Sequence, residues 1–150
     1  TKEDQDRLLR LWRESLLVLE EKSDPPKVYS AWEKLVSTAR EIGVEIHLNG
    51  TLPTEKKVLS VFVDIVHEAL NNAIRHGEAK NLDIKLEEED RMVRCTIRND
   101  GAPPEEPIRE KGGLKNIRER ITLYGGKMSI SAKPYFTLAL SWPKGESNDL

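Results

Sequence analysis

Two segments of the chain carry an apolar residue at every second position, and this alternation limits the possible folds more than any other feature. Each segment contains two such runs separated by a turn, which predicts a β-hairpin with one buried face. The apolar residues are Leu82, Ile84, Leu86, Val93, Cys95 and Ile97 in the first segment, and Met128, Ile130, Ala132, Phe136, Leu138, Leu140 and Trp142 in the second. The apolar face of the resulting sheet has to be covered by a second layer.

Helices can form that second layer. Apolar residues spaced by three and four positions predict helices over residues 2–21, between Pro26 and Gly43, over 55–76 and over 114–124, and alternation predicts a short strand at 44–48. This order of elements predicts an α/β fold. We expect a two-layer α/β sandwich, in which a mixed, mostly antiparallel sheet is covered by helices on one face.

Charge and cysteine content exclude several classes of protein. The chain has 24 Lys and Arg against 26 Asp and Glu residues, so it lacks the basic field of a nucleic-acid-binding protein. Cys95 is the only cysteine, which excludes an intrachain disulfide and a cysteine-rich zinc site. No apolar stretch approaches the roughly 18 residues of a membrane span, and no secretory signal precedes the first helix. We therefore expect a cytoplasmic location.

Polar residues gather at the end of the predicted long helix, in the segment HEALNNAIRHGEA. At about 100° per residue, Glu68, Asn72 and His76 follow one another in steps of about 40° along one edge of the apolar stripe, with Arg75 beside Glu68. Carboxylate and carboxamide oxygens are suitable ligands for Mg²⁺. A solvated helix face with a histidine near its end is the alternative interpretation.

Two later segments combine glycine with polar residues. In IRNDG, a predicted strand ends in Asn99, Asp100 and Gly101, which can line a binding site or simply begin a turn. In EKGGL, Gly112 and Gly113 precede a helix, and the free amides of a helix start attract phosphate. Glycine can also stand at such a place for loop geometry alone.

The order and spacing of these segments resemble the ATP-binding domain of sensor histidine kinases, in the GHKL ATPase superfamily. The resemblance covers about Val28 to Pro143. HEALNNAIRHGEA is similar to the N box of that family, RNDG to its first glycine box and GGLKNIRER to its second. The short loop between the glycine boxes resembles the branch with a short ATP lid, and the implied architecture is the Bergerat-type ATP-binding fold.

The resemblance implies a site for ATP and Mg²⁺. Asn72 matches the asparagine whose side-chain oxygen binds the metal, and Glu68 matches a catalytic position that helps to arrange the metal and the incoming imidazole. Asn99 matches the residue that hydrogen-bonds the adenine amine. The other implied ATP-binding residues are Arg75, His76, Asp100, Gly101, Lys111, Gly112, Gly113 and Leu114.

The chain departs from the family pattern in both glycine boxes and ahead of the last strand. Asn99 stands where aspartate is common, and its uncharged oxygen should accept a weaker hydrogen bond from adenine. Pro103 and Lys111 stand where glycines are common, and Tyr135-Phe136 replaces a frequent Gly-Thr pair. These departures motivate an alternative function, a degenerate GHKL module that serves as a non-catalytic signalling scaffold.

The resemblance also implies a division of the chain. We expect residues 1–24 to form an N-terminal helix that is a remnant of the connection to a dimerisation and phosphoacceptor domain. Residues 25–144 would be the histidine kinase-like ATPase domain, and residues 145–150 a polar tail. Because the chain begins at Thr1, we expect it to be a piece of a longer protein.

The function implied is that of a protein histidine kinase, of which this chain is the ATP-binding part. It would transfer the γ-phosphoryl group of Mg·ATP to a histidine on a domain absent from this chain, so the isolated fragment should not autophosphorylate. The implied partners are the histidine-containing dimerisation domain of the same protein and a response regulator, without direct nucleic-acid contact. We expect a full-length homodimer, for which a membrane anchor stays open. An anti-sigma-type serine kinase is a further alternative.

Overall fold

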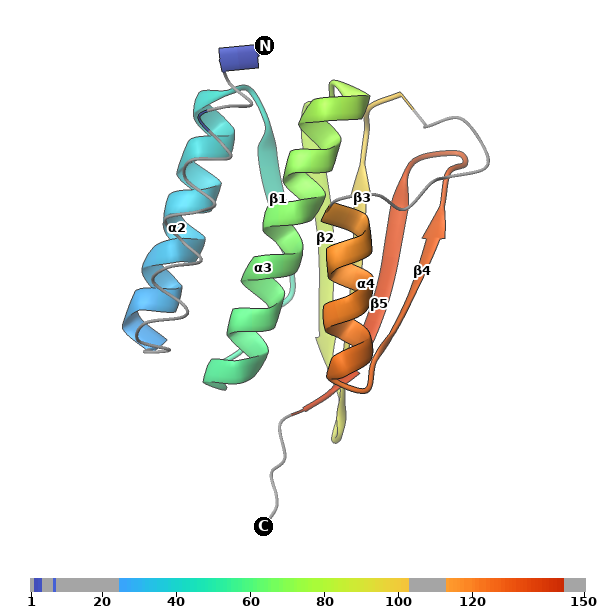
Figure 1. Cartoon of the computed structure of the whole chain (residues 1–150). Coiled ribbons are helices and arrows are strands. Elements are labelled where there is room, and N and C mark those ends of the chain that lie inside the picture. Colours follow the sequence, from blue (N-terminus) through green and yellow to red (C-terminus); the bar gives the residue numbers. More distant parts are fainter. Residues whose placement is uncertain (1, 4–6, 8–24, 103–112, 145–150) are drawn as a thin grey trace.

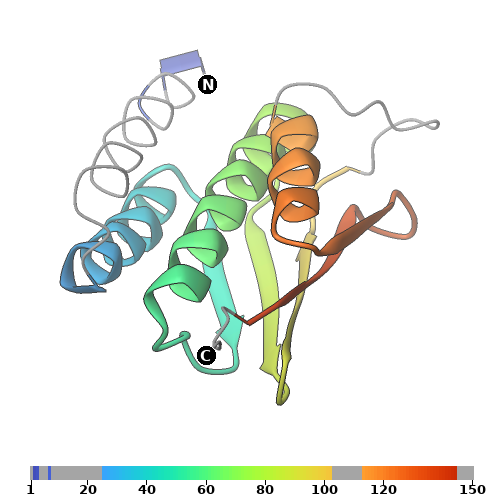
Figure 2. The ribbon, with the colours of Figure 1, turned by 60° about the horizontal axis from the view of Figure 1, so that its bottom comes forward.

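The protein forms one layer of helices on one face of a five-stranded sheet (Figure 1). The computed structural model describes residues 2–3, 7, 25–102 and 113–144, with the backbone alone described at 25–29, 76 and 77. Figure 2 shows the described helices together on one side of the sheet. The predicted α/β sandwich of two layers is therefore confirmed.

The helices begin and end where proline and glycine predict. Helix α2 spans Pro25–Glu41 and starts on proline, which suits the first helical position because that residue has no need of an amide hydrogen. Gly43 follows it with a φ of 94°, the left-handed conformation expected after a helix end. Helix α3 spans Lys56–Asn72, and helix α4 spans Gly113–Leu123.

The sheet has the strand order β1-β2-β3-β5-β4. Its strands are β1 (Glu45–Asn49), β2 (Asn81–Glu88), β3 (Met92–Asn99), β4 (Lys127–Ser131) and β5 (Thr137–Pro143). Only β1 and β2 pair in parallel, and the other three pairings are antiparallel. The register places Ile84, Ile97 and Leu138 side by side across three strands, so the inward-facing residues form one continuous apolar surface.

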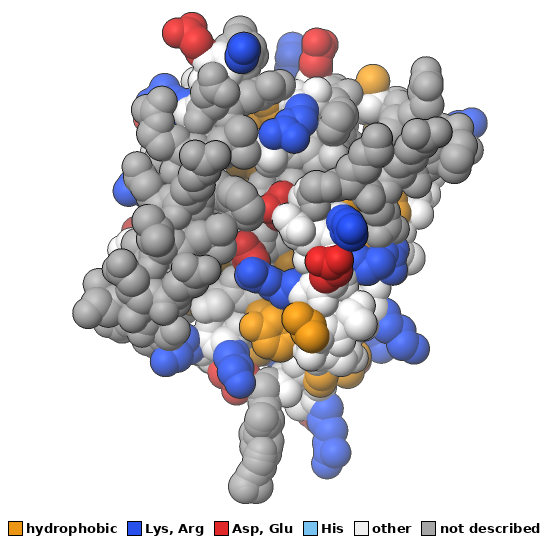
Figure 3. Space-filling model, viewed as in Figure 1, with side chains coloured by type: hydrophobic (Ala, Val, Ile, Leu, Met, Phe, Trp, Pro, Cys, Tyr) orange, Lys and Arg blue, Asp and Glu red, His pale blue; other side chains and the backbone are white. Residues whose placement is uncertain are grey.

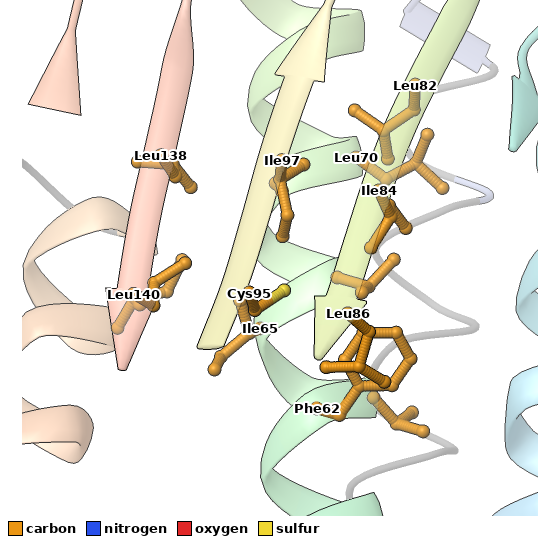
Figure 4. Packing of buried hydrophobic residues seen from close by; sticks show 14 of the residues in the cluster. Phe62, Ile65, Leu70, Leu82, Ile84, Leu86, Cys95, Ile97, Leu138 and Leu140 are labelled. Atoms are coloured by element: carbon orange, nitrogen blue, oxygen red, sulfur yellow. The ribbon is translucent and has the colours of Figure 1, made fainter. Parts of the chain in front are cut away.

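Helix α3 lies against this surface and is the centre of the core (Figure 4). Phe62, Ile65 and Leu70 of α3 are almost completely buried and point toward the inward-facing residues of β2, β3 and β5. The ring of Phe62 also lies next to α2, because its centroid is 5.2 Å from that of the Trp32 ring. Burial of aromatic and aliphatic surface therefore joins α2, α3 and the sheet.

The end of the long helix differs from the prediction. We expected an α-helix to residue 76 with Gly77 as its left-handed end. The α-helix instead ends at Asn72 and continues as the π-helical turn η1 (Ala73–Gly77), and the left-handed residue is Glu78, with a φ of 51°. Hydrophobic periodicity cannot distinguish one wider turn from an α-helical turn, and turns of this kind frequently occur at functional sites.

Several expectations fall outside the described residues. These are the course of the chain through residues 8–24, the polar tail at 145–150, and the loop at 103–112 that would form the short lid. Within the described part of the chain, no helix has the length and apolar composition needed to cross a membrane.

Gly126, three residues after the end of α4, tests how tightly the chain packs on the sheet at this point. A β-carbon at Gly126 would lie 2.9 Å from Ile121 Cγ2 and 2.9 Å from Trp142 Cβ, and against the backbone oxygen of Ser141. We expect Gly126→Ala to lower the free energy of unfolding by about 2–3 kcal/mol because the core cannot accept the added methyl group. Urea denaturation followed by circular dichroism measures the change.

Gly43→Ala is the control for this variant, because no atom of the described residues lies within 4 Å of a β-carbon there. Its cost should be only the strain of a left-handed alanine, about 1 kcal/mol. Equal losses in the two variants would show that the contacts of Gly126 are not restrictive.

His67 of α3 predicts a pH dependence of stability. The side chain is buried, neither ring nitrogen has a hydrogen-bond partner among the described residues, and burial lowers the pKa of His67 from 6.5 to about 4. The unfolded chain therefore binds the proton more readily, and the stability of the folded state falls as the pH drops from 6.5 toward 4. Relative to His67→Gln, the protein should lose about 2 kcal/mol between pH values of about 7.5 and about 5. Urea denaturation at both pH values measures this difference, and a difference independent of pH would contradict the prediction.

Candidate functional site

Glu68 is a buried carboxylate near the end of α3. Helices α2 and α4 and the sheet pack around α3, and the Glu68 side chain is only 7% exposed. Burial raises the pKa of Glu68, and the positive charge of Arg75 opposes this rise. A buried acidic group of this kind is costly unless it is paired or used, which makes Glu68 a candidate for chemistry.

The start of α4 lies directly on Glu68. A β-carbon built at Gly113 would be 3.1 Å from Glu68 Cδ and in closer contact with Oε1, so only glycine leaves the carboxylate in its place. Leu114 follows immediately and is buried in the core. The second glycine box and the N box, predicted as two separate segments, therefore meet at this contact.

Asn72 and Arg75 lie beyond Glu68 at the end of the helical segment. Asn72 is four residues after Glu68 on α3, so it lies on the same side of the helix, and it is half-buried. Arg75 belongs to η1 and is exposed, within electrostatic range of Glu68. The backbone of His76 also lies in η1, and its side chain is outside the described part.

Asn99 is the last residue of β3, and Asp100 follows the strand, so the two side chains have different surroundings. Asn99 is buried on the face of the sheet that carries Ile97, which is the face toward the helices. Its side-chain oxygen accepts a hydrogen bond of 2.9 Å from the amide of Gly101. That oxygen has a second lone pair, so it can still accept a hydrogen bond from a ligand.

Asp100 is exposed, and its hydrogen bonds stabilise the beginning of β2. Its carboxylate accepts hydrogen bonds from the amides of Lys80 (2.8 Å) and Asn81 (2.9 Å) and from Nδ2 of Asn81 (2.8 Å). Burial alone would raise the pKa of Asp100, but these hydrogen bonds outweigh it and keep the pKa below its ordinary value. This structural role needs no ligand, and the predicted ATP contact of Asp100 stays a prediction.

The structure thus brings part of the predicted site together. Glu68 and Gly113 are in contact, and Figure 1 shows that the ends of α3 and β3 lie at the same end of the molecule. Phe136, one of the departures from the family pattern, borders this end, because its carbonyl accepts a 3.2 Å hydrogen bond from the amide of Asn99. Lys111 and Gly112 lie outside the described residues.

Asp64 and Arg120 are near the site and were missed by the sequence analysis. Asp64 of α3 is buried, and its carboxylate forms an ion pair with the guanidinium of Arg120 on α4. The pair crosses a groove of about 360 Å³ between the helices, which is lined by Asp64, Ile65, Glu68, Asn116, Ile117, Glu119, Arg120 and Leu123. The position of Asp64, four residues before Glu68, was the available signal, but the sequence does not show which residue faces it.

The donor groups fit a metal that is held mainly by its substrate. No cluster of three or more histidine, cysteine or acidic residues suited to a metal occurs in the ranges 25–102 and 113–144. Asn72 supplies one amide oxygen, which agrees with the habit of Mg²⁺ of keeping few protein ligands beside water and phosphate. Helix α4 begins at Gly113, and the amides of a helix start attract phosphate.

Curated proteins with similar sequences are kinases. The chain is 29% identical over 72 residues to the signal transduction histidine-protein kinase/phosphatase DegS of Brevibacillus brevis, a match that covers 47% of this chain and 19% of that protein. It is 26% identical over 107 residues to the kinase/phosphatase UhpB of Salmonella typhimurium, covering 68% and 21% respectively. The chain therefore spans about a fifth of the length of these relatives.

Solved structures support the same fold. The histidine kinase domain of the blue-light activated kinase EL346 of Erythrobacter litoralis matches with a TM-score of 0.65 at 14% identity, over 94% of this chain and 73% of that one. The ATP binding domain of PrrB from Mycobacterium tuberculosis matches with a TM-score of 0.60 at 21% identity, over 77% and 92%.

The family model described as histidine kinase-, DNA gyrase B- and HSP90-like ATPase matches residues 58–146. This match covers more than half of the chain and includes Glu68, Asn72, Asn99 and Gly113. The chain accordingly belongs to the histidine kinase-, DNA gyrase B- and HSP90-like ATPase family, the GHKL superfamily, and its homologues are sensor histidine kinases.

Proposed function

We propose that this chain binds Mg·ATP and transfers the γ-phosphoryl group to a histidine imidazole on a domain outside the chain. The observation that supports the proposal is the contact between Gly113 and Glu68, which brings a helix start against a buried carboxylate on the helix that also carries Asn72. Phosphoryl transfer depends mainly on positioning and charge stabilisation, and these groups are suited to both.

The phosphates would lie between the end of α3 and the start of α4. The amides at a helix start attract anions, and α4 starts at Gly113. The side-chain oxygen of Asn72 would hold Mg²⁺, which supplies charge neutralisation to the phosphate oxygens when it is bound. The exposed guanidinium of Arg75 would pair with phosphate oxygens.

Glu68 would act on the incoming imidazole. As the bond from phosphorus to the bridging oxygen of ADP breaks, a bond forms from phosphorus to one ring nitrogen, and the other nitrogen gives up its proton. The buried carboxylate can orient the ring and accept that proton, because burial raises its pKa and makes it a stronger base.

Adenine would be recognised at the end of β3. Asn99 is buried on the helix-facing side of the sheet, and the free lone pair of its oxygen can accept a hydrogen bond from the exocyclic amine. An uncharged acceptor gives a weaker bond than aspartate would. We expect a modest affinity for ATP in consequence.

The other components would lie in the longer protein. Because the chain spans about a fifth of its relatives DegS and UhpB, the dimerisation domain with the acceptor histidine is proposed to be on the same polypeptide. A response regulator would receive the phosphoryl group afterwards. A homodimer that acts in the cytoplasm, where ATP is abundant, is part of the same proposal.

Calorimetric titration with a non-hydrolysable ATP analogue tests the role of Asn72. We expect binding in the presence of Mg²⁺, weakened about tenfold or more in Asn72→Ala because a ligand of the metal is lost. Without Mg²⁺ the two proteins should bind equally. Asn71→Ala is the matched control, since Asn71 is the adjacent half-buried amide, with a side-chain oxygen that has no hydrogen-bond partner in the described part of the chain.

No heat at millimolar concentrations of the analogue would count against the proposal and favour the non-catalytic scaffold. A loss in Asn71→Ala as large as that in Asn72→Ala would show that the amides matter for folding and not for the metal.

Glu68→Gln separates binding from transfer. Glutamine keeps the shape that packs under Gly113 but cannot accept a proton, so affinity for the analogue should stay within about threefold while histidine phosphorylation in the full-length protein slows about 100-fold. Incorporation of labelled phosphate measures the rate. Glu119→Gln, an exposed glutamate of α4, should leave the rate unchanged. Transfer by Glu68→Gln at the normal rate would remove Glu68 from the reaction.

A further inference from the structure

Three polar side chains follow one side of α3 in steps of four residues: Asp64, Glu68 and Asn72. Asp64 and Glu68 are each only 7% exposed and Asn72 is half-buried. Figure 1 shows α4 running beside α3 in the opposite direction. Two described contacts join the helices along this polar line, Gly113 on Glu68 at the start of α4 and Arg120 with Asp64 two turns later.

Apolar packing leaves part of this helix pair unfilled. Helix α4 has eleven residues, and its buried side chains, Leu114, Ile117 and Ile121, attach it to the core by one stripe. The groove of about 360 Å³ lies beside that stripe, and Leu123 at its edge is 87% exposed. Figure 3 shows basic and acidic side chains close together over this region, with apolar side chains beside them.

The ion pair of Asp64 with Arg120 therefore joins α3 and α4 where apolar packing does not. The Asp64 side chain is 9% exposed and that of Arg120 is 43% exposed, so the attraction is poorly screened on the α3 side. A buried carboxylate without its partner is strongly unfavourable, which fixes Arg120 over Asp64. Gly113 and Arg120 belong to the same helix, α4. When Arg120 is held against Asp64, the position of Gly113 relative to α3 is therefore held as well.

The geometry points to Asp64 and Arg120 as positioning residues for phosphoryl transfer. They hold the start of α4 at the level of Glu68 and Asn72, where the phosphates of Mg·ATP would bind. This inference rests on the proposed function. The two residues act through the placement of Gly113 and do not themselves touch the nucleotide.

A double-mutant cycle on the whole chain tests the inference. The variants are Asp64→Asn, which keeps the side-chain shape, Arg120→Gln, and both together. Affinities for a Mg·ATP analogue and for adenosine are measured by NMR titration. Adenosine lacks the phosphates, so it reports on the base site at β3 and not on the start of α4.

We expect each single variant to bind the ATP analogue about tenfold more weakly, and the double variant no more weakly than the singles, because one interaction is lost in all three. Adenosine affinity should change less than about twofold. Glu119→Gln, which removes a different charge from the same groove, should behave like the unmodified protein.

Three results would overturn the inference: unchanged affinity in the single variants, losses that multiply in the double variant, or equal losses for the analogue and adenosine. If Arg120→Gln does not fold, Arg120→Met takes its place in the cycle, since methionine keeps an unbranched apolar stem and removes the charge. Failure of the unmodified protein to bind the analogue would overturn the proposed function and this inference with it, whereas binding that the variants leave intact would overturn the inference alone.

Discussion

The nearly complete burial of α3 is the constraint on which the rest of the structure depends. Residues 58–70 of this helix are buried except at one position, because the sheet, α2 and α4 pack around it. Polar groups in such a place require a partner or a use. Asp64 has the guanidinium of Arg120, Glu68 has the start of α4 and the nearby charge of Arg75, and His67 stays neutral. The helix with the least access to water thus determines where α4 can lie and where charge can be placed.

Most of the fold was predictable because the apolar residues recur either at every second position, as in a strand, or at every third or fourth position, as in a helix. Alternation predicts both hairpins and the strand β1, and the spacing of three and four predicts α2, α3 and α4 to within a few residues. Glycine at 43 predicts the end of a helix in the same way. The π-helical turn η1 was not predictable, since one extra residue in a single turn hardly changes the apolar pattern. The ion pair of Asp64 with Arg120 joins residues far apart in the chain, and no local pattern reports such a pairing.

The candidate site was predictable to the same degree. Glu68 and Asn72 share a helix, so their spacing alone places them on one side, and the structure agrees. The contact of Gly113 with Glu68 was not predicted, because it depends on how α4 crosses α3. Asn99 and Asp100 are adjacent in sequence, yet Asn99 is buried on the helix-facing side of the sheet, whereas Asp100 accepts hydrogen bonds from the amides at the start of β2. This favours the amide over the carboxylate as the acceptor for a base.

The two ends of the proposed nucleotide site differ in how firmly they are held. The end of β3 is fixed by backbone hydrogen bonds on both sides, from Asn99 to Phe136 and from Asp100 to Asn81. The start of α4 is fixed by side chains, namely an apolar stripe on one face, Arg118 with the carbonyl of Met128 at 3.1 Å, and Arg120 with Asp64. Backbone pairing within a sheet yields less readily than long arginine side chains, which have many rotamers. Changes in the surroundings of α4 would therefore alter phosphate binding at the proposed site before they alter base recognition.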